Sequence, residues 1–519
     1  MIYTRKTPAT LIMGIIFMAY GYLVKANMLD GLMATLKVEK LTGEMISISL
    51  AAGAVGIIIG LWQLLASPKE GSMDYYLSTV AGALFILLVA AAVKWGLAPW
   101  VAVIGKAMGT VGDTGKTIDK LLGLNYVVLG IIAGIVIVNY LKIPSWAENG
   151  VRLSRLGLKT GVILLGALYS MAELAKLGRL SVVMIGFFVL GSVGMVLWLG
   201  SRRNIPNSMG GVLSAGMGVC GVSATVAASP VVQAKSTEIA YTIGTILLWG
   251  VLMMFIFPPV GHALGMGPIQ FGAWAGTGIL NSAQVAGAAL AFQPNGIETL
   301  KVAEIFNITR VLFLPIIVLW LAVWYVKREE GAQQVNVGKV IVGKFPVFVL
   351  GFILIFALSS TGIFAPANHY KGKYFDNNIK EAKLLKDEEV AALQAQSDKV
   401  QREDRKAALA RLIENKKVMS IDDDDTLRGL VNAKVLDKDA NKILKNAHKA
   451  VRHTAKRVKA FRNLIVWFFA FGLVGLGMQI TFSSIKQAGG QPLVIGTIVG
   501  TTKAIGALIV ILMFVRETI

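Results

Sequence analysis

Residues 208–234 mix glycines, hydroxyl-bearing side chains and a proline within an otherwise apolar stretch. Glycine and proline propagate a straight helix poorly, so the pattern predicts a helix that breaks inside a membrane. A broken helix exposes backbone N–H groups at a positive helix end, which suits an anion. The alternative is an unbroken helix that packs closely through its small residues. The candidate substrate ligands in this segment are Gly218, Cys220, Gly221, Ser223 and Thr225.

Residues 272–293 have the same character and add amide side chains. Asn281 and Gln284 are three positions apart and therefore share one face of a helix. An amide in an apolar span is costly unless it is hydrogen-bonded, so we expect both side chains to point inward. Hydrogen bonding between helices explains them about as well as substrate contact does. The candidate ligands here are Thr277, Asn281 and Gln284.

The span that follows places Glu304, Asn307 and Arg310 at three-residue intervals on one face. The donor fork of a buried arginine fits an oxyanion, so Arg310 is a candidate to neutralise an anionic substrate. An interfacial arginine whose head reaches the membrane surface is an equally good interpretation. Lys503 lies inside the last apolar span, where its ammonium needs water, a counter-charge or substrate.

The elements that position these residues belong to a membrane protein. Of 519 residues, 55% are hydrophobic and 16% are charged, whereas about a quarter of a soluble protein is charged. A helix needs roughly 20 apolar residues to cross a bilayer. Apolar stretches of this kind fall at about 9–25, 47–66, 75–93, 124–141, 154–172, 180–200, 238–258, 304–326, 345–363, 463–482 and 492–515. We expect an all-α, multi-pass protein of a bacterial inner membrane, with 94–122 as an interfacial segment or loop.

Several classes of function are disfavoured by composition. Cys220 is the only cysteine and the four histidines are dispersed, so we expect no metal centre and no cofactor. The net charge of +21 includes no basic patch interleaved with aromatic residues, which argues against nucleic acid. No Ser/His/Asp grouping occurs in the apolar part, and the protein is not expected to be an enzyme.

Charge is concentrated in one late region, which suggests a division of the chain. The expected parts are extra transmembrane helices at 1–122, a transporter core at 123–365 and 463–519, and a soluble insertion at 366–462. Within the insertion, two amphipathic helices at about 377–417 and 427–460 are expected to form a hairpin. The acidic run Asp422–Asp425 is interpreted as its solvated turn, because the oxygen spacing of a calcium loop is missing.

Basic segments predict how the chain is oriented. Residues 142–159, 201–203 and 327–344 are rich in lysine and arginine, and such loops favour the cytoplasm. A single crossing at 345–363 then places the insertion in the periplasm. The lysines of the insertion do not contradict this, because long translocated domains largely escape the rule.

A weak internal repeat also points to transport. Leu165-Gly166, Ser170, Leu174 and Gly178 recur in register as Leu476-Gly477, Thr481, Ile485 and Gly489. Many secondary transporters build a central site from repeats of inverted topology. We therefore expect an inverted-repeat core.

Several stretches together resemble a known family. They are Gly216 to Ala224 (GMGVCGVSA), Ser229-Pro230-Val231-Val232, Ala283-Gln284-Val285, Arg310-Val311-Leu312, and Leu476-Gly477 through Pro492. In this order they resemble the YeiH-type family, a conserved hypothetical integral membrane family usually labelled as sulfate exporters. The likeness runs from about Leu124 to the C-terminus, outside 366–462. It implies a fold similar to the bile-acid/cation-antiporter superfamily, with two discontinuous helices that cross at mid-membrane. A His-Glu pair usual in that family is replaced here by Leu280-Asn281.

The favoured hypothesis is a secondary transporter of a small anion, such as sulfate or a related oxyanion or sulfonate. Its expected partners are the bilayer, a coupling ion that is either a proton or sodium, and a second copy in a homodimer. The alternative is a non-transporting receptor or scaffold that acts through the insertion. A membrane enzyme ranks third.

Overall fold

The structure, a computed structural model, describes residues 7–65, 73–109, 117–121, 124–169, 171–294, 297–329, 338, 347–364, 373–433, 435–454, 456–486 and 488–515. The chain forms two compact units. The first comprises Met1–Val162, Gly178–Val349 and Leu464–Val515, and the second comprises Ile163–Leu177, Leu350–Asn463 and Arg516–Ile519. Each unit is described by itself.

Every predicted span falls on a helix. These helices are α1 (Ala9–Lys25), α3 (Thr42–Leu65), α4 (Met73–Ala92), α7 (Tyr126–Val136), α8 (Glu148–Leu165), α9 (Met171–Arg202), α12 (Ser236–Ala263), α15 (Glu298–Leu312), α16 (Leu314–Val326), α18 (Val347–Ser360), α23 (Lys456–Gly477) and α25 (Gly490–Phe514). Among the described residues, seven helices are long and apolar enough to cross a membrane. The number is eight if α1 and the short α2 (Asp30–Leu36), bent by 89°, form one span. The expectation of an all-helical, multi-pass protein is confirmed.

Of the two alternatives predicted for 94–122, the loop is wrong in its first part, which is helical, and the interfacial segment stays a prediction. Helix α4 continues through a π-helical turn (Val93–Leu97) into α5 (Ala98–Ala107), whereas residues 110–116 lie outside the described part. Lys94 lies inside this helix and pairs with Glu44, in the first turn of α3, at 2.6 Å. The side chain of Glu44 is half-buried, and this pairing with a distant helix compensates the charge of the lysine.

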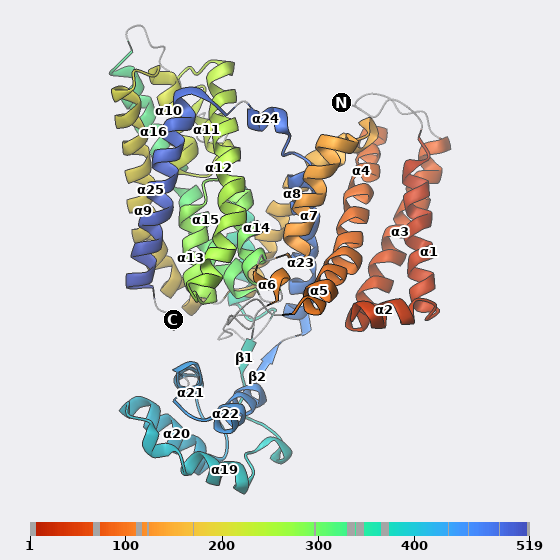
Figure 1. Cartoon of the computed structure of the whole chain (residues 1–519), viewed down its shortest axis with the longest axis vertical. Helices are drawn as coiled ribbons and strands as arrows, with labels where there is room; N and C mark the ends of the chain where they lie inside the picture. Colours follow the sequence, from red (N-terminus) through yellow and green to blue (C-terminus); the bar gives the residue numbers. More distant parts are fainter. Residues whose placement is uncertain are drawn as a thin grey trace. The chain divides into compact units, whose positions relative to one another are not determined.

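Helices α1 and α3 pack along their length (Figure 1). Gly14 and Gly56 face each other so closely that a Cβ on Gly14 would lie 2.5 Å from the Gly56 carbonyl carbon. Thr10 donates a buried hydrogen bond to Gln63 Oε1 at 2.7 Å. Small residues and a polar bond are the usual means by which apolar helices associate in a bilayer.

Both segments with unusual composition are broken helices, as predicted. Residues 208–234 form α10 (Asn207–Gly218) and α11 (Val222–Ala228), and 272–293 belong to α13 (Pro268–Gly278) and α14 (Ser282–Phe292). The resemblance implied that the two broken helices cross. Instead, each pair folds back on itself as a hairpin, because Gly216 of α10 lies against Thr225 of α11 and Phe271 of α13 stacks on Phe292 of α14.

The second unit contains α18, which packs on the 3₁₀ turn η6 (Gly166–Leu168). Ser359 of α18 donates to the Ala167 carbonyl at 3.0 Å. Strands β1 (Lys373–Phe375) and β2 (Arg452–Thr454) then pair antiparallel, with Lys373 opposite Thr454. This ribbon leads into the region predicted as a helical hairpin (Figure 1).

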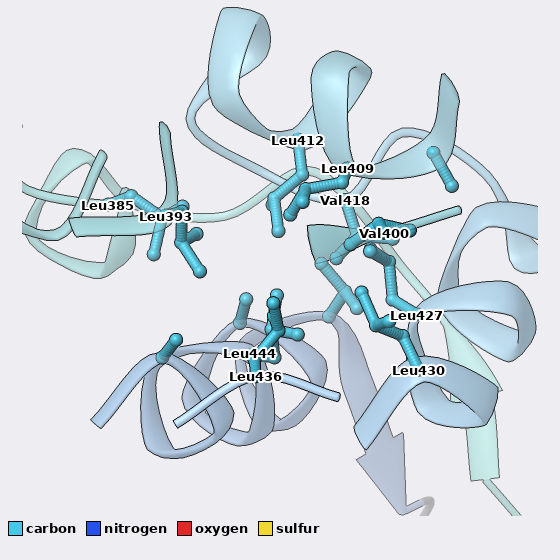
Figure 2. Packing of buried hydrophobic residues seen from close by; sticks show 14 residues of the cluster. Leu385, Leu393, Val400, Leu409, Leu412, Val418, Leu427, Leu430, Leu436 and Leu444 are labelled. Carbon is cyan, nitrogen blue, oxygen red and sulfur yellow. The ribbon is translucent and has the colours of Figure 1, made fainter. Parts of the chain in front are cut away.

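That region is not a two-helix hairpin. It contains α19 (Asp387–Gln394), α20 (Glu403–Asn415), α21 (Ile421–Ala433) and α22 (Lys438–Val451). Apolar side chains from these helices and their connections point toward one another and form a separate core (Figure 2): Leu385, Leu393, Val400, Ala408, Leu409, Leu412, Val418, Leu427, Leu430, Leu436, Ala440, Leu444, Ala447 and Val451. The short helices follow from the need to close this small core.

The acidic run Asp422–Asp425 starts helix α21 and is not a turn, contrary to the prediction. Carboxylates are stabilised at a helix N-terminus by the helix dipole. Asp423 forms an ion pair with Arg411, and Asp424 accepts from His448 Nδ1 at 2.7 Å and Arg452 Nε at 2.6 Å. Two residues of the run, Asp423 and Asp424, are therefore buried and paired with cations.

We expect Asp424 to make this region sensitive to acid. Burial acts to raise its pKa, but the hydrogen bond from His448 and the charge of Arg452 outweigh burial and hold the pKa below its usual value. A lowered pKa contributes stability above the ordinary aspartate pKa of about 3.9, and this contribution is lost as pH falls below it. Asp424→Asn should cost about 3–5 kcal/mol and remove that acid dependence.

The measurement is hydrogen exchange of α21 and α22 against pH, corrected for intrinsic exchange. Asp422→Asn, which alters an exposed carboxylate of the same helix turn, is the matched control. An unchanged acid dependence in Asp424→Asn would contradict the assignment.

Parts of the orientation and repeat arguments remain predictions. Most of 327–344 and Ser170 of the internal repeat lie outside the described residues. Helix α8 begins at Glu148, so much of the predicted basic loop 142–159 is helical. The side of the membrane on which the insertion lies stays a prediction.

Candidate functional site

Helices α10 and α11 form hairpin 1 (207–228), which enters and leaves at the N-terminal end of α12. A Cβ on Gly211, near the start of α10, would lie 2.7 Å from Val232, which precedes α12. A Cβ on Gly216, near the end of α10, would lie 2.4 Å from Thr225 of α11. The two helices therefore run antiparallel with their turn toward the middle of α12.

Helices α13 and α14 form hairpin 2 (268–292), which enters and leaves at the opposite end of α12. Phe271 at the start of α13 stacks on Phe292 at the end of α14, with ring centroids 3.9 Å apart. Both rings lie against Gly261 in the last turn of α12. Hairpin 2 is therefore also antiparallel, and it points toward hairpin 1.

Each hairpin is long enough to reach about halfway through a bilayer. Helix α10 has 12 residues and α13 has 11, which at 1.5 Å per residue is roughly 16–18 Å. The hydrocarbon core is about 30 Å thick. Hairpins of this length that enter from opposite ends meet near the middle.

The two turns do meet. Tip 1 (219–221) and tip 2 (279–281) touch where a Cβ on Gly221 would lie 3.0 Å from the Asn281 Cα. The Ser282 amide, just after tip 2, donates to the Cys220 carbonyl at 3.5 Å. Both tips lie near Gly250, close to the middle of α12, where an added Cβ would be 3.3 Å from Asn281 Cβ.

Gly221 has a backbone conformation that other residues rarely adopt, with φ +83° and ψ −128°. Gly221→Ala should destabilise the protein by about 1–3 kcal/mol, because the backbone is strained and the new methyl group meets Asn281. A lowered melting temperature in detergent checks this. Gly191→Ala on α9, where an added Cβ meets nothing within 4 Å, is the control. Equal melting temperatures for the two variants would contradict the tip geometry.

Arg310 lies beside tip 2 and is fully buried. Its Nη1 donates to the Ile279 carbonyl at the end of α13, and its Nη2 donates to Asn307 Oδ1 at 3.0 Å and reaches Ser282 Oγ at 3.5 Å. Its Nε has no partner among the described residues. The interfacial alternative is therefore wrong, because a snorkelling arginine keeps its head in water.

Glu304 and Arg310 are linked through Asn307. Asn307 Nδ2 donates to Glu304 Oε2 at 3.0 Å, and the oxygen of the same amide accepts from Arg310. Glu304 is 1% exposed and Asn307 4%. The three residues that share one helix face by sequence thus form one hydrogen-bonded chain.

Lys503 lies beside tip 1, although it was not among the predicted ligands. Its Nζ donates to the carbonyls of Met217 (3.0 Å) and Gly218 (3.2 Å), the last residues of α10. The lysine sits near the middle of α25, which also accepts a bond from Trp274 of α13 at Ala504. The signal in the sequence was a single charge inside an apolar span.

The electrostatics around the tips are one-sided. The carbonyl ends of α10 and α13 are the negative ends of their dipoles, and each is bound by a cation, Lys503 or Arg310. The first turns of α11 and α14 contain no acidic residue. Apart from Glu304, the described charges at the tips are therefore positive.

Several buried polar atoms near the tips have no partner within the described residues. They are Gln284 Oε1 and Nε2, Thr277 Oγ1, Arg310 Nε, Trp249 Nε1 and Thr245 Oγ1. Gln284 is completely buried and its oxygen packs on Gly250. A buried amide without partners is costly, so Gln284 is a candidate to contact a solute or an ordered water.

The structure brings most predicted ligands together. Gly218, Cys220, Gly221, Asn281, Gln284 and Arg310 lie at or beside the two tips. The Thr225 hydroxyl donates to the Gly221 carbonyl at 3.2 Å and so stabilises the conformation of tip 1. Thr277 is buried two residues before Ile279. Ser223 is exposed on α11, and its role as a ligand stays a prediction. No group of three metal-ligating side chains occurs among the described residues.

Comparison with known proteins identifies a family. The profile of the family described as "Conserved hypothetical protein 698" matches residues 81–378, a range that includes both hairpins, Glu304 and Arg310. No solved structure matches the chain.

Named relatives agree with that match. A UPF0324 membrane protein of Nitratidesulfovibrio vulgaris is 35% identical over 403 residues, which cover 77% of this chain and 86% of the relative. A second one from the same organism is 40% identical over 259 residues, 49% of this chain and 71% of the relative. One from Rhodopirellula baltica is 30% identical over 257 residues, 48% and 46% of the two chains.

The names of these relatives state membrane residence and no substrate. The expectation of a conserved hypothetical integral membrane family is confirmed, and the sulfate label is not among the names. The chain is a multi-pass membrane protein that belongs to the family of Conserved hypothetical protein 698 and the bacterial UPF0324 membrane proteins.

Proposed function

We propose that this protein is a secondary transporter of a small anion, bound where tip 1 meets tip 2. The observation that carries the proposal is the pair of half-length hairpins, which enter from opposite ends of α12 and meet near its middle. There, Lys503 of α25 and Arg310 of α15 bind the carbonyl ends of α10 and α13. Irregular backbone at membrane depth is tolerated only inside protein or beside a watery cavity. Its usual purpose in transporters is to bind a solute.

The charge and the donors favour an oxyanion. Arg310 has an unused Nε donor, and Gln284 offers an unpartnered amide N–H₂. Two of the first amides of α14 already have acceptors, because Ser282 donates to the Cys220 carbonyl and Gln284 to the Asn281 carbonyl, so the start of α14 contributes mainly its positive dipole end. A planar fork, a side-chain amide and a positive helix end together suit sulfate, a related oxyanion or a sulfonate.

The arrangement also suggests how access alternates. Each hairpin closes the path from one end of α12, so movement of one hairpin bundle against its neighbours opens one side at a time. Entry from opposite ends is what an inverted repeat that relates the two hairpins would produce. The repeat of 165–178 in 476–489 lies outside both hairpins and stays a separate prediction. The coupling ion, a proton or sodium, and a homodimer are part of the same proposal.

Purified protein in liposomes tests the proposal. Sulfate, thiosulfate, sulfite, methanesulfonate and short carboxylates are screened first by thermal shift and then for radiolabelled uptake or counterflow. We expect at least one oxyanion to stabilise the protein and to exchange across the membrane. An absence of both binding and exchange across the panel would overturn the proposal.

Removal of the α19–α22 region separates transport from the scaffold alternative. Lys373 and Thr454 are paired across the ribbon, so a short glycine-serine linker can replace residues 373–454. Because that region has its own core, we expect anion exchange by the deletion variant within about threefold of the full chain. Loss of all activity in a variant that still purifies as a folded protein would favour the scaffold.

A further inference from the structure

Glu304 is a buried carboxyl group that the proposed anion site does not use directly. An ionisable side chain within a membrane span is costly and characteristically marks an ion or proton pathway. The carboxyl group lies one amide away from the arginine that would bind the anion, because Asn307 contacts both at 3.0 Å. Its position therefore allows it to influence Arg310.

The Asn307 side chain, which bridges Glu304 and Arg310, responds to the protonation of Glu304. An ionised carboxylate only accepts hydrogen bonds, whereas an amide has one accepting and one donating side. With Glu304 ionised, the Asn307 N–H₂ faces the carboxylate and its oxygen holds Arg310, as observed. A protonated Glu304 has an O–H that needs an acceptor, and the Asn307 oxygen is within reach if the amide turns.

A turned amide can no longer hold the arginine. Its N–H₂ would face the donors of Arg310, and two donors repel. Arg310 would then lose one of its present acceptors, and its fork would become free for an anion. Protonation of Glu304 and binding of an anion therefore favour each other.

The neighbouring helices supply few other charges that could control Glu304. Helices α13 and α14, which pack on α15, contain no acidic, basic, histidine or tyrosine residue. Helix α16 contributes Tyr325 at its far end, and α15 itself adds Glu298, Lys301 and Arg310. Lys301 is one turn from Glu304 and is buried.

Two further helices approach this face. Helix α9 contacts α15 where Ser181 bonds Thr309 at 3.0 Å, and the described ionisable side chain on α9 is Arg202 at its last residue. Helix α25 contributes Lys503, which is held at the end of α10. Among these described groups, Arg310 is the charge that a hydrogen-bonded bridge, through Asn307, connects to Glu304.

We propose that Glu304 is a proton-binding site that couples proton movement to the anion, so that one proton and one anion cross together. The proposal rests on the anion transport proposed above. The step is a simple association: the Glu304 carboxylate and a proton form a carboxylic acid on one side, and the O–H bond breaks on the other. Nothing is oxidised or reduced. The choice between a proton and sodium as coupling ion is thereby made in favour of the proton.

Proton uptake by the unmodified protein is the first test. Sulfate, thiosulfate or methanesulfonate, whichever binds most tightly, is added to detergent-solubilised protein in weak buffer with a pH dye, across pH 5 to 9. Sulfate, thiosulfate and methanesulfonate do not themselves take up protons in this range. We expect uptake approaching one proton per bound anion at some pH. Anion binding that is accompanied by proton uptake at no pH in this range would overturn the proposal.

Liposome transport with Glu304→Gln is the second test. A pH gradient, acidic outside, should drive accumulation of the anion in the unmodified protein, while counterflow measures exchange without a gradient. We expect the ratio of gradient-driven accumulation to counterflow to fall at least tenfold in Glu304→Gln. The matched control is Glu298→Gln in the first turn of the same helix, which should preserve the ratio. An unchanged ratio in Glu304→Gln would overturn the proposal.

The two proposals fail in different ways. If the unmodified protein shows no counterflow, anion transport itself is wrong, whereas counterflow without gradient-driven accumulation contradicts only the role of Glu304. If Glu304→Gln does not fold, Asn307→Ala keeps both charged residues and removes the bridge. Proton uptake per bound anion should then fall at least threefold, and full uptake would contradict the bridge.

Discussion

Arg310→Ala is expected to abolish anion binding and exchange while the protein still inserts in the membrane. The guanidinium is fully buried, binds the carbonyl end of α13 and has a free donor at the tips. Truncation of a buried, hydrogen-bonded charge typically costs about 2–5 kcal/mol of binding. At 1.4 kcal/mol per tenfold, anion affinity should fall by roughly 30-fold to 3,000-fold.

Two further variants make this result specific. Arg310→Lys keeps the charge without the planar fork and should give an intermediate loss of affinity. Arg202→Ala removes an exposed arginine, stacked over Trp198 at the end of α9, and should bind the anion normally. Titration by thermal shift and counterflow in liposomes measure both effects. Normal exchange by a folded Arg310→Ala protein would exclude Arg310 from the site.

Lys503→Met is expected to destabilise the protein and to weaken anion binding. The Met217 and Gly218 carbonyls would lose the Nζ donor that binds them at the end of α10. An unsatisfied buried polar group costs about 1–3 kcal/mol, and two are affected here. The melting temperature in detergent should drop, and a saturating anion should restore less of it than in the unmodified protein.

Lys486→Met is the control for this variant, because Lys486 is exposed at the end of α24 (Phe482–Lys486). It should leave both melting temperature and anion response unchanged. A Lys503→Met protein as stable as the control would mean that the end of α10 does not depend on the lysine.

The breaks in the two hairpins could be predicted from sequence because they follow from local chemistry. Gly221 at tip 1 and the glycines before tip 2 disfavour continued helix, whatever surrounds them. The direction of the chain after each break could not be predicted. A crossing helix and a hairpin have the same local sequence, and the difference lies in contacts such as Phe271 with Phe292.

Charged residues were the main source of error, because their environment is set by distant partners. Lys94 begins a segment predicted as interfacial or loop, and it is helical and paired with Glu44. Asp424 was assigned to a solvated turn and is buried with His448 and Arg452. A sequence shows the charge but not the partner, so burial of a paired charge is hard to foresee.

The membrane charges were predicted with mixed success for the same reason. The common face of Glu304, Asn307 and Arg310 follows from three-residue spacing, and the hydrogen-bonded chain confirms it. Lys503 could be recognised as unusual, but its acceptors lie in α10, nearly three hundred positions earlier in the chain. Ser223 is exposed on α11, and its spacing alone does not show whether it faces a solute.

Thiol labelling of Cys220 tests the meeting of the tips at an anion site most directly, because this cysteine lies in tip 1 and is the only one in the chain. Protein in liposomes is treated with a small anionic methanethiosulfonate reagent, with and without sulfate and the other panel anions. We predict slow labelling that a bound anion slows at least tenfold further, with this protection lost in Arg310→Ala. Labelling at the same rate with every anion, or protection that persists without Arg310, would contradict an anion site between the tips.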